Sequence, residues 1–187
     1  MMLVAGKHSY KLLLNDMYRR MLTIFFKFRL ITNIDISSVV IKQMRSTVQR
    51  DRPEMKFEEV DVFNLTFEKE SFTVALDKGT LDGLISTEAS KDVNRTNKLF
   101  DEISKVLKIG GRYVIISLLQ EHVLKAILDY FTENGWMIRI ARCHDVEKKH
   151  VEETGELSMP IFFVVCTKFK KMYNVDPVSI TIIMVVI

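Results

Sequence analysis

The chain has 187 residues, of which 48% are hydrophobic and 27% are charged, and its formal net charge is +3. This length and composition fit one globular domain with a substantial core, so we predict a single domain over residues 1–187. Basic and acidic residues are interspersed, which argues against binding to nucleic acid. No run reaches the roughly 20 apolar residues that span a bilayer, so we expect no membrane partner.

The two cysteines, Cys143 and Cys166, have neither the spacing of metal ligands nor enough partners for a disulfide framework. We interpret them as buried free thiols, which fits a protein of the reducing cytoplasm. The four histidines form no cluster with the cysteines, and the sequence therefore predicts no metal site.

From residue 30 onward, short runs of β-branched and aromatic residues alternate with helical patterns. We predict strands over residues 30–36, 55–62 and 72–76. Either Ser37 or Ser38 could cap the helix that follows the first of them. A polar turn over residues 77–80 ends the third. This alternation is typical of an α/β fold, with a doubly wound and mostly parallel sheet.

A long helix comes next, and its buried face is predicted at Leu99, Ile103, Val106 and Leu107. We expect Gly110 and Gly111 to stop it. Later elements are predicted as a strand over 112–119, a helix that ends at Asn134 and Gly135, and strands over 136–141 and 160–168. A polar connection over 142–158, with no obvious crossover helix, predicts that the last two strands form an antiparallel pair at the C-terminal end. The uncharged residues 178–187 are either a final core strand or an exposed segment prone to aggregation.

Three of the predicted strands end at an aspartate, and ligands bind outside the carboxyl ends of strands in a doubly wound sheet. Asp35 can accept hydrogen bonds from both hydroxyls of an adenosine ribose, or it caps the next helix. Asp61, with Val62 beside it, can accept a hydrogen bond from the exocyclic amine of an adenine, or it is a solvated acid at a strand end. Asp77 lies where the reacting groups of a cofactor and a substrate would meet, and Gly79 supplies the turn there.

The sequence around these aspartates resembles the class I S-adenosylmethionine-dependent methyltransferases, and closely the N-terminal domain of the methyltransferase-like protein 13 family. The resemblance covers about residues 31–169 and is carried by Asn33-Ile-Asp-Ile-Ser-Ser-Val-Val-Ile-Lys-Gln-Met44, Leu76-Asp-Lys-Gly-Thr-Leu-Asp-Gly-Leu84, Val106-Leu-Lys-Ile-Gly-Gly-Arg-Tyr113 and Pro160-Ile-Phe-Phe-Val-Val-Cys-Thr-Lys-Phe169. It implies a Rossmann-like fold, S-adenosylmethionine as the cofactor, and a protein substrate. That family methylates a lysine of translation elongation factor 1-alpha.

Carried onto this sequence, the resemblance assigns the cofactor's ribose to Asp35 and its adenine to Asp61 and Val62. It places Ile36 in the cofactor site as well. Asp77 would lie beside the methionine portion of the cofactor or the incoming amine, which makes it the candidate catalytic residue.

On the substrate side, the resemblance points to Lys78, Gly79 and Thr80. Lys78 could orient a substrate acid, or it could hold the turn together through a salt bridge. Methyl transfer to a lysine is an in-line displacement, so alignment and a neutral amine suffice, and neither a metal nor a dedicated base is required. A nearby cation and partial desolvation both lower the pKa of such an amine.

The glycine loop departs from the family pattern. Gly6 is its best candidate, at the end of a first strand, but Lys7-His8-Ser9 follows without a second glycine. The interval from Gly6 to Asp35 exceeds the roughly 20 residues of comparable units. Residues 1–30 and 170–187 are atypical of the family.

Several functions therefore stay open. The leading prediction is a protein methyltransferase directed at lysine. The alternatives are a catalytically inactive binding module of the same fold, and a truncated gene product with a damaged cofactor loop. A nicotinamide-dependent dehydrogenase ranks below these, because it does not explain the polar segment 77–82.

Overall fold

The fold is taken from a computed structural model, which describes residues 2–6, 30–48, 53–85, 91–155, 159–170 and 184–186. The strands are β1 (Met2–Gly6), β2 (Ile31–Asp35), β3 (Lys56–Glu59), β4 (Phe72–Lys78), β5 (Leu107–Ser117), β6 (Met137–Arg142), β7 (Phe162–Thr167) and β8 (Met184–Val186). The helices of the described residues are α2 (Ser38–Val48), α3 (Thr80–Leu84), α4 (Lys91–Val106), α5 (Glu121–Glu133) and α6 (His144–Thr154).

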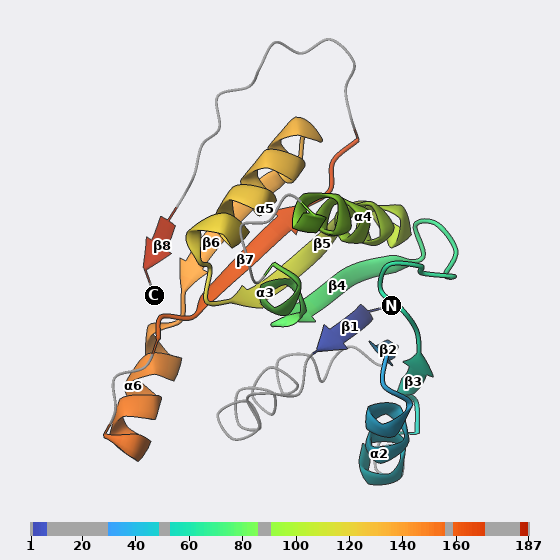
Figure 1. Ribbon diagram of the computed structural model, residues 1–187, viewed down its shortest axis with the longest axis horizontal. Coiled ribbons are helices and arrows are strands. Elements are labelled where there is room, and N and C mark those ends of the chain that lie inside the picture. The colour runs from blue at the N-terminus through green and yellow to red at the C-terminus, as the bar shows by residue number, and fades with distance from the viewer. Residues whose placement is uncertain are drawn as a thin grey trace.

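The described strands form one sheet in the order β3-β2-β1-β4-β5-β7-β6-β8 (Figure 1). Strands β3, β2, β1, β4 and β5 run parallel to one another. Strand β7 lies between β5 and β6 and is antiparallel to both. The predicted α/β fold with an antiparallel strand pair is confirmed.

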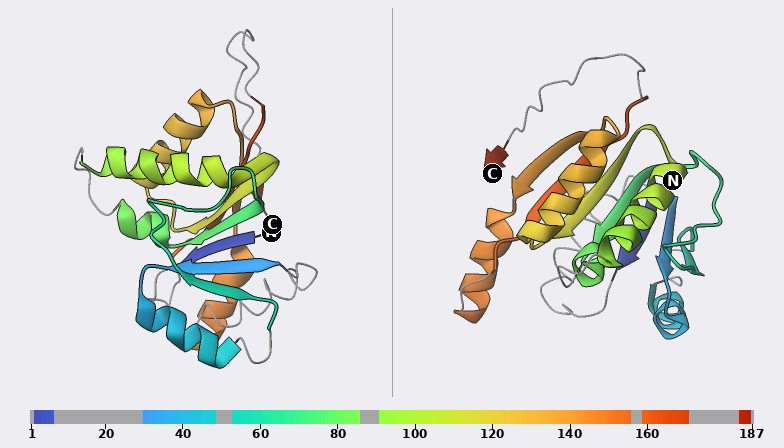
Figure 2. Two further views of the ribbon diagram at one scale, coloured as in Figure 1. Left: turned by 90° about the vertical axis from the view of Figure 1, so that its right-hand side faces the viewer. Right: turned by 45° about the horizontal axis from the view of Figure 1, so that its top comes forward.

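Apolar residues pack on both faces of the sheet. Helices α3, α4 and α5 cover one face of the sheet, as Figure 2 shows. The larger core lies on this face and includes Ala75 of β4. The next residue, Leu76, packs on the opposite face together with Ile41 of α2. Successive side chains of a strand point to opposite faces, so Asp77 follows Ala75 toward the face of α3.

The first βα connection is close to its prediction. Of the two candidate serines, Ser37 is the helix cap, because its Oγ accepts a hydrogen bond from the backbone N–H of Val40 at 3.4 Å and α2 begins at Ser38. Strand β3 is shorter than predicted and ends at Glu59. Beyond it, the N–H of Val60 donates to the carbonyl oxygen of Asp35.

The prediction that Gly110 and Gly111 stop the long helix is wrong. Helix α4 ends at Val106, and Leu107 already belongs to β5. The end of the helix is closed by Lys168, a residue distant in sequence, whose Nζ donates to the carbonyl oxygens of Ser104 and Leu107 at 2.9 and 2.8 Å. A cation at a helix C-terminus satisfies the last carbonyls without a glycine.

The two glycines instead form an irregularity inside β5. Leu107 pairs with Phe72 and Arg112 with Val74, so residues 108–111 bulge out of the ladder. Gly110 adopts a left-handed φ of 78° there. The bulge is held at its base, where the N–H of Gly110 donates to the carbonyl of Lys168 at 2.8 Å.

A second prediction is wrong in the connection 142–158, which contains helix α6. The helix is mostly exposed and polar, so it lacks the apolar periodicity by which helices are recognised in a sequence. It leaves the end of β6 and returns at the same edge to the start of β7, and the two strands therefore still pair antiparallel. Figure 1 shows α6 projecting from this edge of the sheet.

The remaining general predictions concern the cysteines and the tail. Cys143 and Cys166 are buried free thiols, as predicted. Residues 184–186 of the apolar tail form β8 and pair parallel with β6, whereas the rest of the tail lies outside the described residues. No helix in the described ranges is long and apolar enough to cross a membrane.

Candidate functional site

The carboxyl ends of three neighbouring parallel strands, β2, β1 and β4, lie side by side. Gly6 pairs with Lys78 across β1 and β4, and Ala5 pairs with Ile34 across β1 and β2, so Gly6 and Asp35 come next along their strands. The structure thus brings three of the predicted site residues to one place. Residues 7–29, where a glycine loop would continue, lie outside the described residues.

Asp35 occupies the end of β2 in a tight turn. Its Oδ1 accepts a hydrogen bond from the N–H of Ser37 at 2.7 Å, and the helix cap itself is supplied by Ser37. Among the described residues, no donor reaches its second carboxylate oxygen. Ile36 is 72% exposed directly beside it. An acceptor oxygen next to an exposed apolar side chain is a suitable surface for a nucleoside.

Asp61 lies in the loop after β3, two residues beyond the end of the strand. Its side chain is exposed, and its Oδ1 accepts a hydrogen bond from the N–H of Phe63 at 2.9 Å. Val62 is half-buried and packs against the larger core. The loop is also held from α4, where the guanidinium of Arg95 lies 4.8 Å from the ring centroid of Phe63. It therefore has a fixed position beside the end of β2.

Asp77 is 2% exposed, and both of its oxygens accept hydrogen bonds from within the chain. The hydroxyl of Tyr113 donates to Oδ2 at 2.8 Å, and the N–H of Thr80 donates to Oδ1 at 2.9 Å. Burial raises the pKa of Asp77 to about 6, although these donors favour the carboxylate. The role of Asp77 at a cofactor or substrate stays a prediction.

The turn after Asp77 carries the substrate-side residues. Gly79 has a φ of 70°, and a Cβ at this position would meet no atom within 4 Å, so the backbone conformation and not space favours glycine. Lys78 is half-buried, and burial lowers its pKa to about 8. The Oγ1 of Thr80 is buried and has no hydrogen-bond partner among the described residues.

Other polar side chains complete this edge of the sheet, and sequence reasoning missed them. Tyr113 holds Asp77, and the hydroxyl of Ser117 donates to Asp82 on α3. The sequence by itself assigns His122 to no site. In the structure it is half-buried, and its Nε2 lies 2.7 Å from the carbonyl oxygen of Ile85. The sequence signal that could have identified Tyr113 and Ser117 is the period-two alternation of β5, which places both side chains on the same face as Asp77.

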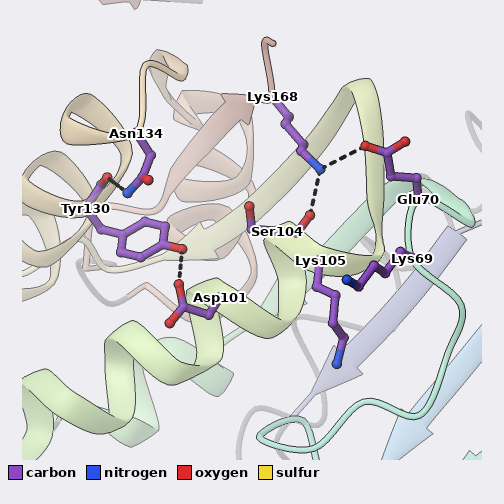
Figure 3. Close-up of a pocket in the computed structure, with 8 residues that line it drawn as sticks. All are labelled: Lys69, Glu70, Asp101, Ser104, Lys105, Tyr130, Asn134 and Lys168. Atoms are coloured by element: carbon purple, nitrogen blue, oxygen red, sulfur yellow. Dashed lines mark hydrogen bonds and ion pairs between the residues drawn. The ribbon is translucent and has the colours of Figure 1, made fainter. Parts of the chain in front are cut away.

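Figure 3 shows a separate hollow at the opposite ends of the sheet's strands, away from the candidate site. It lies where α4 and α5 end and where β4 and β5 begin, and Tyr130, Asp101, Lys168 and Glu70 are among its lining residues. The candidate site lies at the carboxyl ends of the same strands, so the hollow and the site are at opposite ends of the strands.

In the described part of the chain, no group of three histidine, cysteine or acidic side chains could hold a metal ion.

Comparison with known proteins agrees with the fold. The family described as "Methyltransferase domain" matches residues 12–162. The chain belongs to this family. This methyltransferase domain is also similar in structure to a methyltransferase from Pyrococcus furiosus, with a TM-score of 0.63 and 14% sequence identity over 91% of this chain and 75% of that chain.

Two curated relatives resemble the domain in sequence. It is 45% identical over 147 residues to the "eEF1A lysine and N-terminal methyltransferase homolog" of Drosophila melanogaster, and 40% identical over 143 residues to the "eEF1A lysine and N-terminal methyltransferase" of Homo sapiens. These alignments cover 78% and 76% of this chain. They cover only 22% and 20% of the relatives, so the methyltransferase domain spans about a fifth of their length.

Proposed function

We propose that this methyltransferase domain transfers a methyl group from S-adenosylmethionine to a lysine of translation elongation factor 1-alpha. The names of the two relatives, both methyltransferases of eEF1A, support the reaction and the substrate. The observation that carries the proposal is the meeting of Gly6, Asp35 and Lys78 at the ends of neighbouring parallel strands. In sheets of this kind, nucleotide-like ligands bind at such strand ends.

The residues present fit the adenosine half of this cofactor. The second oxygen of Asp35 would accept hydrogen bonds from ribose hydroxyls, and the exposed Ile36 would offer an apolar surface beside it. Asp61 and Val62 would bind the adenine from the loop that Asp35 holds through the N–H of Val60. Gly6, which has no side chain, would let the backbone approach the methionine portion.

On the substrate side, the turn over residues 78–80 would receive the lysine. S-adenosylmethionine supplies a methyl group on a sulfonium centre, and the acceptor amine must be neutral to take it. Lys78 presents a second cation at this edge, which favours the neutral form of an amine close to it. Thr80 belongs to the same turn, and its hydroxyl is buried without a partner among the described residues.

The proposal is tested in two steps. Calorimetric titration of the 187-residue chain with S-adenosylmethionine should show saturable binding. Incubation with recombinant elongation factor 1-alpha and isotopically labelled cofactor should then label a lysine, located by mass spectrometry. Absence of binding at millimolar cofactor would contradict the cofactor assignment, and labelling of the substrate's N-terminus alone would contradict the lysine assignment.

A second candidate function is a methyltransferase-like module that binds a protein without catalysis. It is favoured by Lys7-His8-Ser9, which stands where a second glycine is expected. Such a module would bind elongation factor 1-alpha but transfer no label. The variant His8→Gly creates a Gly-x-Gly sequence at residues 6–8, and a gain of cofactor binding in this variant would show that the loop alone limits the natural chain. The cytoplasmic location stays a prediction.

A further inference from the structure

The inference begins with a buried hydrogen-bonded pair between β4 and β5. Tyr113 is 1% exposed and Asp77 is 2% exposed, and the Tyr113 hydroxyl donates to Oδ2 of Asp77 at 2.8 Å. Phe100 of α4 and Phe131 of α5 surround the tyrosine ring, with centroids 6.2 and 6.0 Å away. The hydroxyl therefore has a fixed position and no access to bulk water.

The other oxygen of the same carboxylate holds the first turn of α3. Oδ1 of Asp77 accepts hydrogen bonds from the N–H groups of Thr80 and Leu81 at 2.9 and 3.4 Å. Directly before these two residues, the N–H of Gly79 donates to the carbonyl of Ile116 on β5 at 3.2 Å. The conformation of residues 78–80 thus depends on how the Asp77 carboxylate is oriented, and Tyr113 fixes that orientation.

We propose that Tyr113 is a positioning residue for the methyltransferase site, acting through Asp77 to hold the Lys78-Gly79-Thr80 turn in its binding conformation. The inference rests on the proposed function, because it assigns this turn to the cofactor and substrate. Tyr113 does not touch either ligand in this account. It contributes by keeping a buried carboxylate ionised and correctly oriented.

The charge state of the pair makes the role measurable. Burial raises the pKa of Asp77, and the hydrogen bond from Tyr113 lowers it again. The other titratable groups that act on the pair are Asp82 on α3, which raises both pKa values, and Cys166 on β7, which raises that of Tyr113. The neighbours Phe100 and Phe131 are uncharged. Loss of the tyrosine hydroxyl should therefore raise the pKa of Asp77.

The test compares Tyr113→Phe with the natural chain by titration with S-adenosylmethionine at several pH values. We expect affinity to fall about tenfold at pH 7, because without this hydrogen bond the turn spends less of its time in the binding conformation. We also expect the pH at which affinity declines to move upward, because protonated Asp77 holds α3 less well. Tyr130→Phe is the matched control: its hydroxyl donates to Asp101 in the hollow of Figure 3, and neither quantity should change.

The variant Asp77→Asn separates positioning from simple loss of stability. If Tyr113 acts through Asp77, adding Tyr113→Phe to Asp77→Asn should change affinity little further, whereas independent effects would add. Additive losses, or an unchanged pH profile in Tyr113→Phe, would overturn the inference.

Failure of the proposed function gives a different result. If the natural chain does not bind the cofactor, the Asp77 carboxyl carbon can still be titrated by NMR in the natural chain and in Tyr113→Phe. An unchanged pKa in the variant would contradict the link between the two residues directly. A raised pKa would preserve the link and leave only the methyltransferase assignment in error.

Discussion

Asp82 on α3 accepts a hydrogen bond from the hydroxyl of Ser117 at the end of β5, with 2.5 Å between the two oxygens. The same carboxylate accepts the N–H of Leu118 at 3.3 Å, and Ser117 Oγ in turn accepts the N–H of Leu119. Leu119 has a left-handed φ of 49°, which a non-glycine residue adopts only when its surroundings hold it there. One serine therefore joins α3 to the end of β5.

Substitution of Ser117 should consequently destabilise the fold. We expect Ser117→Ala to lower the free energy of unfolding by about 1–3 kcal/mol, because the partly buried Asp82 carboxylate and the N–H of Leu119 each lose a hydrogen bond. Urea denaturation followed by circular dichroism measures the change. The control is Ser46→Ala on α2, where the exposed hydroxyl donates to the carbonyl of Gln43 and little change is expected. Equal losses in the two variants would contradict the role of Ser117.

The buried carboxyl of Asp77 should make stability depend on pH. Its pKa rises from 3.8 to about 6 on folding, so the folded state binds the proton more tightly than the unfolded state. The resulting stabilisation is fully present below pH 3.8 and is lost as the pH rises through about 6. Asp77→Asn cannot titrate, so the natural chain should lose roughly 3 kcal/mol relative to the variant over this range. Paired urea titrations at several pH values measure it, and a constant difference would contradict it.

Two glycines should differ in how much a methyl group disturbs them. At Gly79 the space is open and only the positive φ is unfavourable, so Gly79→Ala should cost about 1–2 kcal/mol. At Gly111 a Cβ would lie 2.7 Å from the carbonyl oxygen of Lys108, and the backbone of the bulge would have to shift. We therefore expect Gly111→Ala to be the more destabilising variant in thermal denaturation. The opposite order would mean that the bulge yields easily.

Asp35 should contribute charge to cofactor binding. In Asp35→Asn the side chain keeps an acceptor for the N–H of Ser37 but loses the ionised oxygen proposed for the ribose. We expect affinity for S-adenosylmethionine to fall about tenfold or more, since hydrogen bonds to charged groups are the stronger ones. Asp129→Asn on α5 is the control, because Asp129 is exposed and pairs with Lys125. Unchanged affinity in Asp35→Asn would remove this residue from the site.

Local sequence patterns determined the fold class and the edge of the sheet that carries the candidate site. Period-two strands and period-3.6 helices report burial within a few residues, so β2, the start of α2 and the end of α5 were predicted nearly where they are observed. Asp35 and Asp77 could be placed at strand ends by the same means. The alternation of these elements in turn fixed a mostly parallel sheet.

Contacts between distant residues decided the rest. The sequence continues its helical pattern through Leu107, but Lys168 ends α4 at Val106 by binding the last carbonyl oxygens. Helix α6 was not predicted, because a helix that buries so little apolar surface has no apolar periodicity in its sequence. Asp77 was predicted at a strand end, yet its burial, which raises its pKa, and its hydrogen bonds to Tyr113 and α3 exist only in the folded sheet. Sequence records which face of an element is apolar, whereas the partner of a polar group depends on how the elements pack.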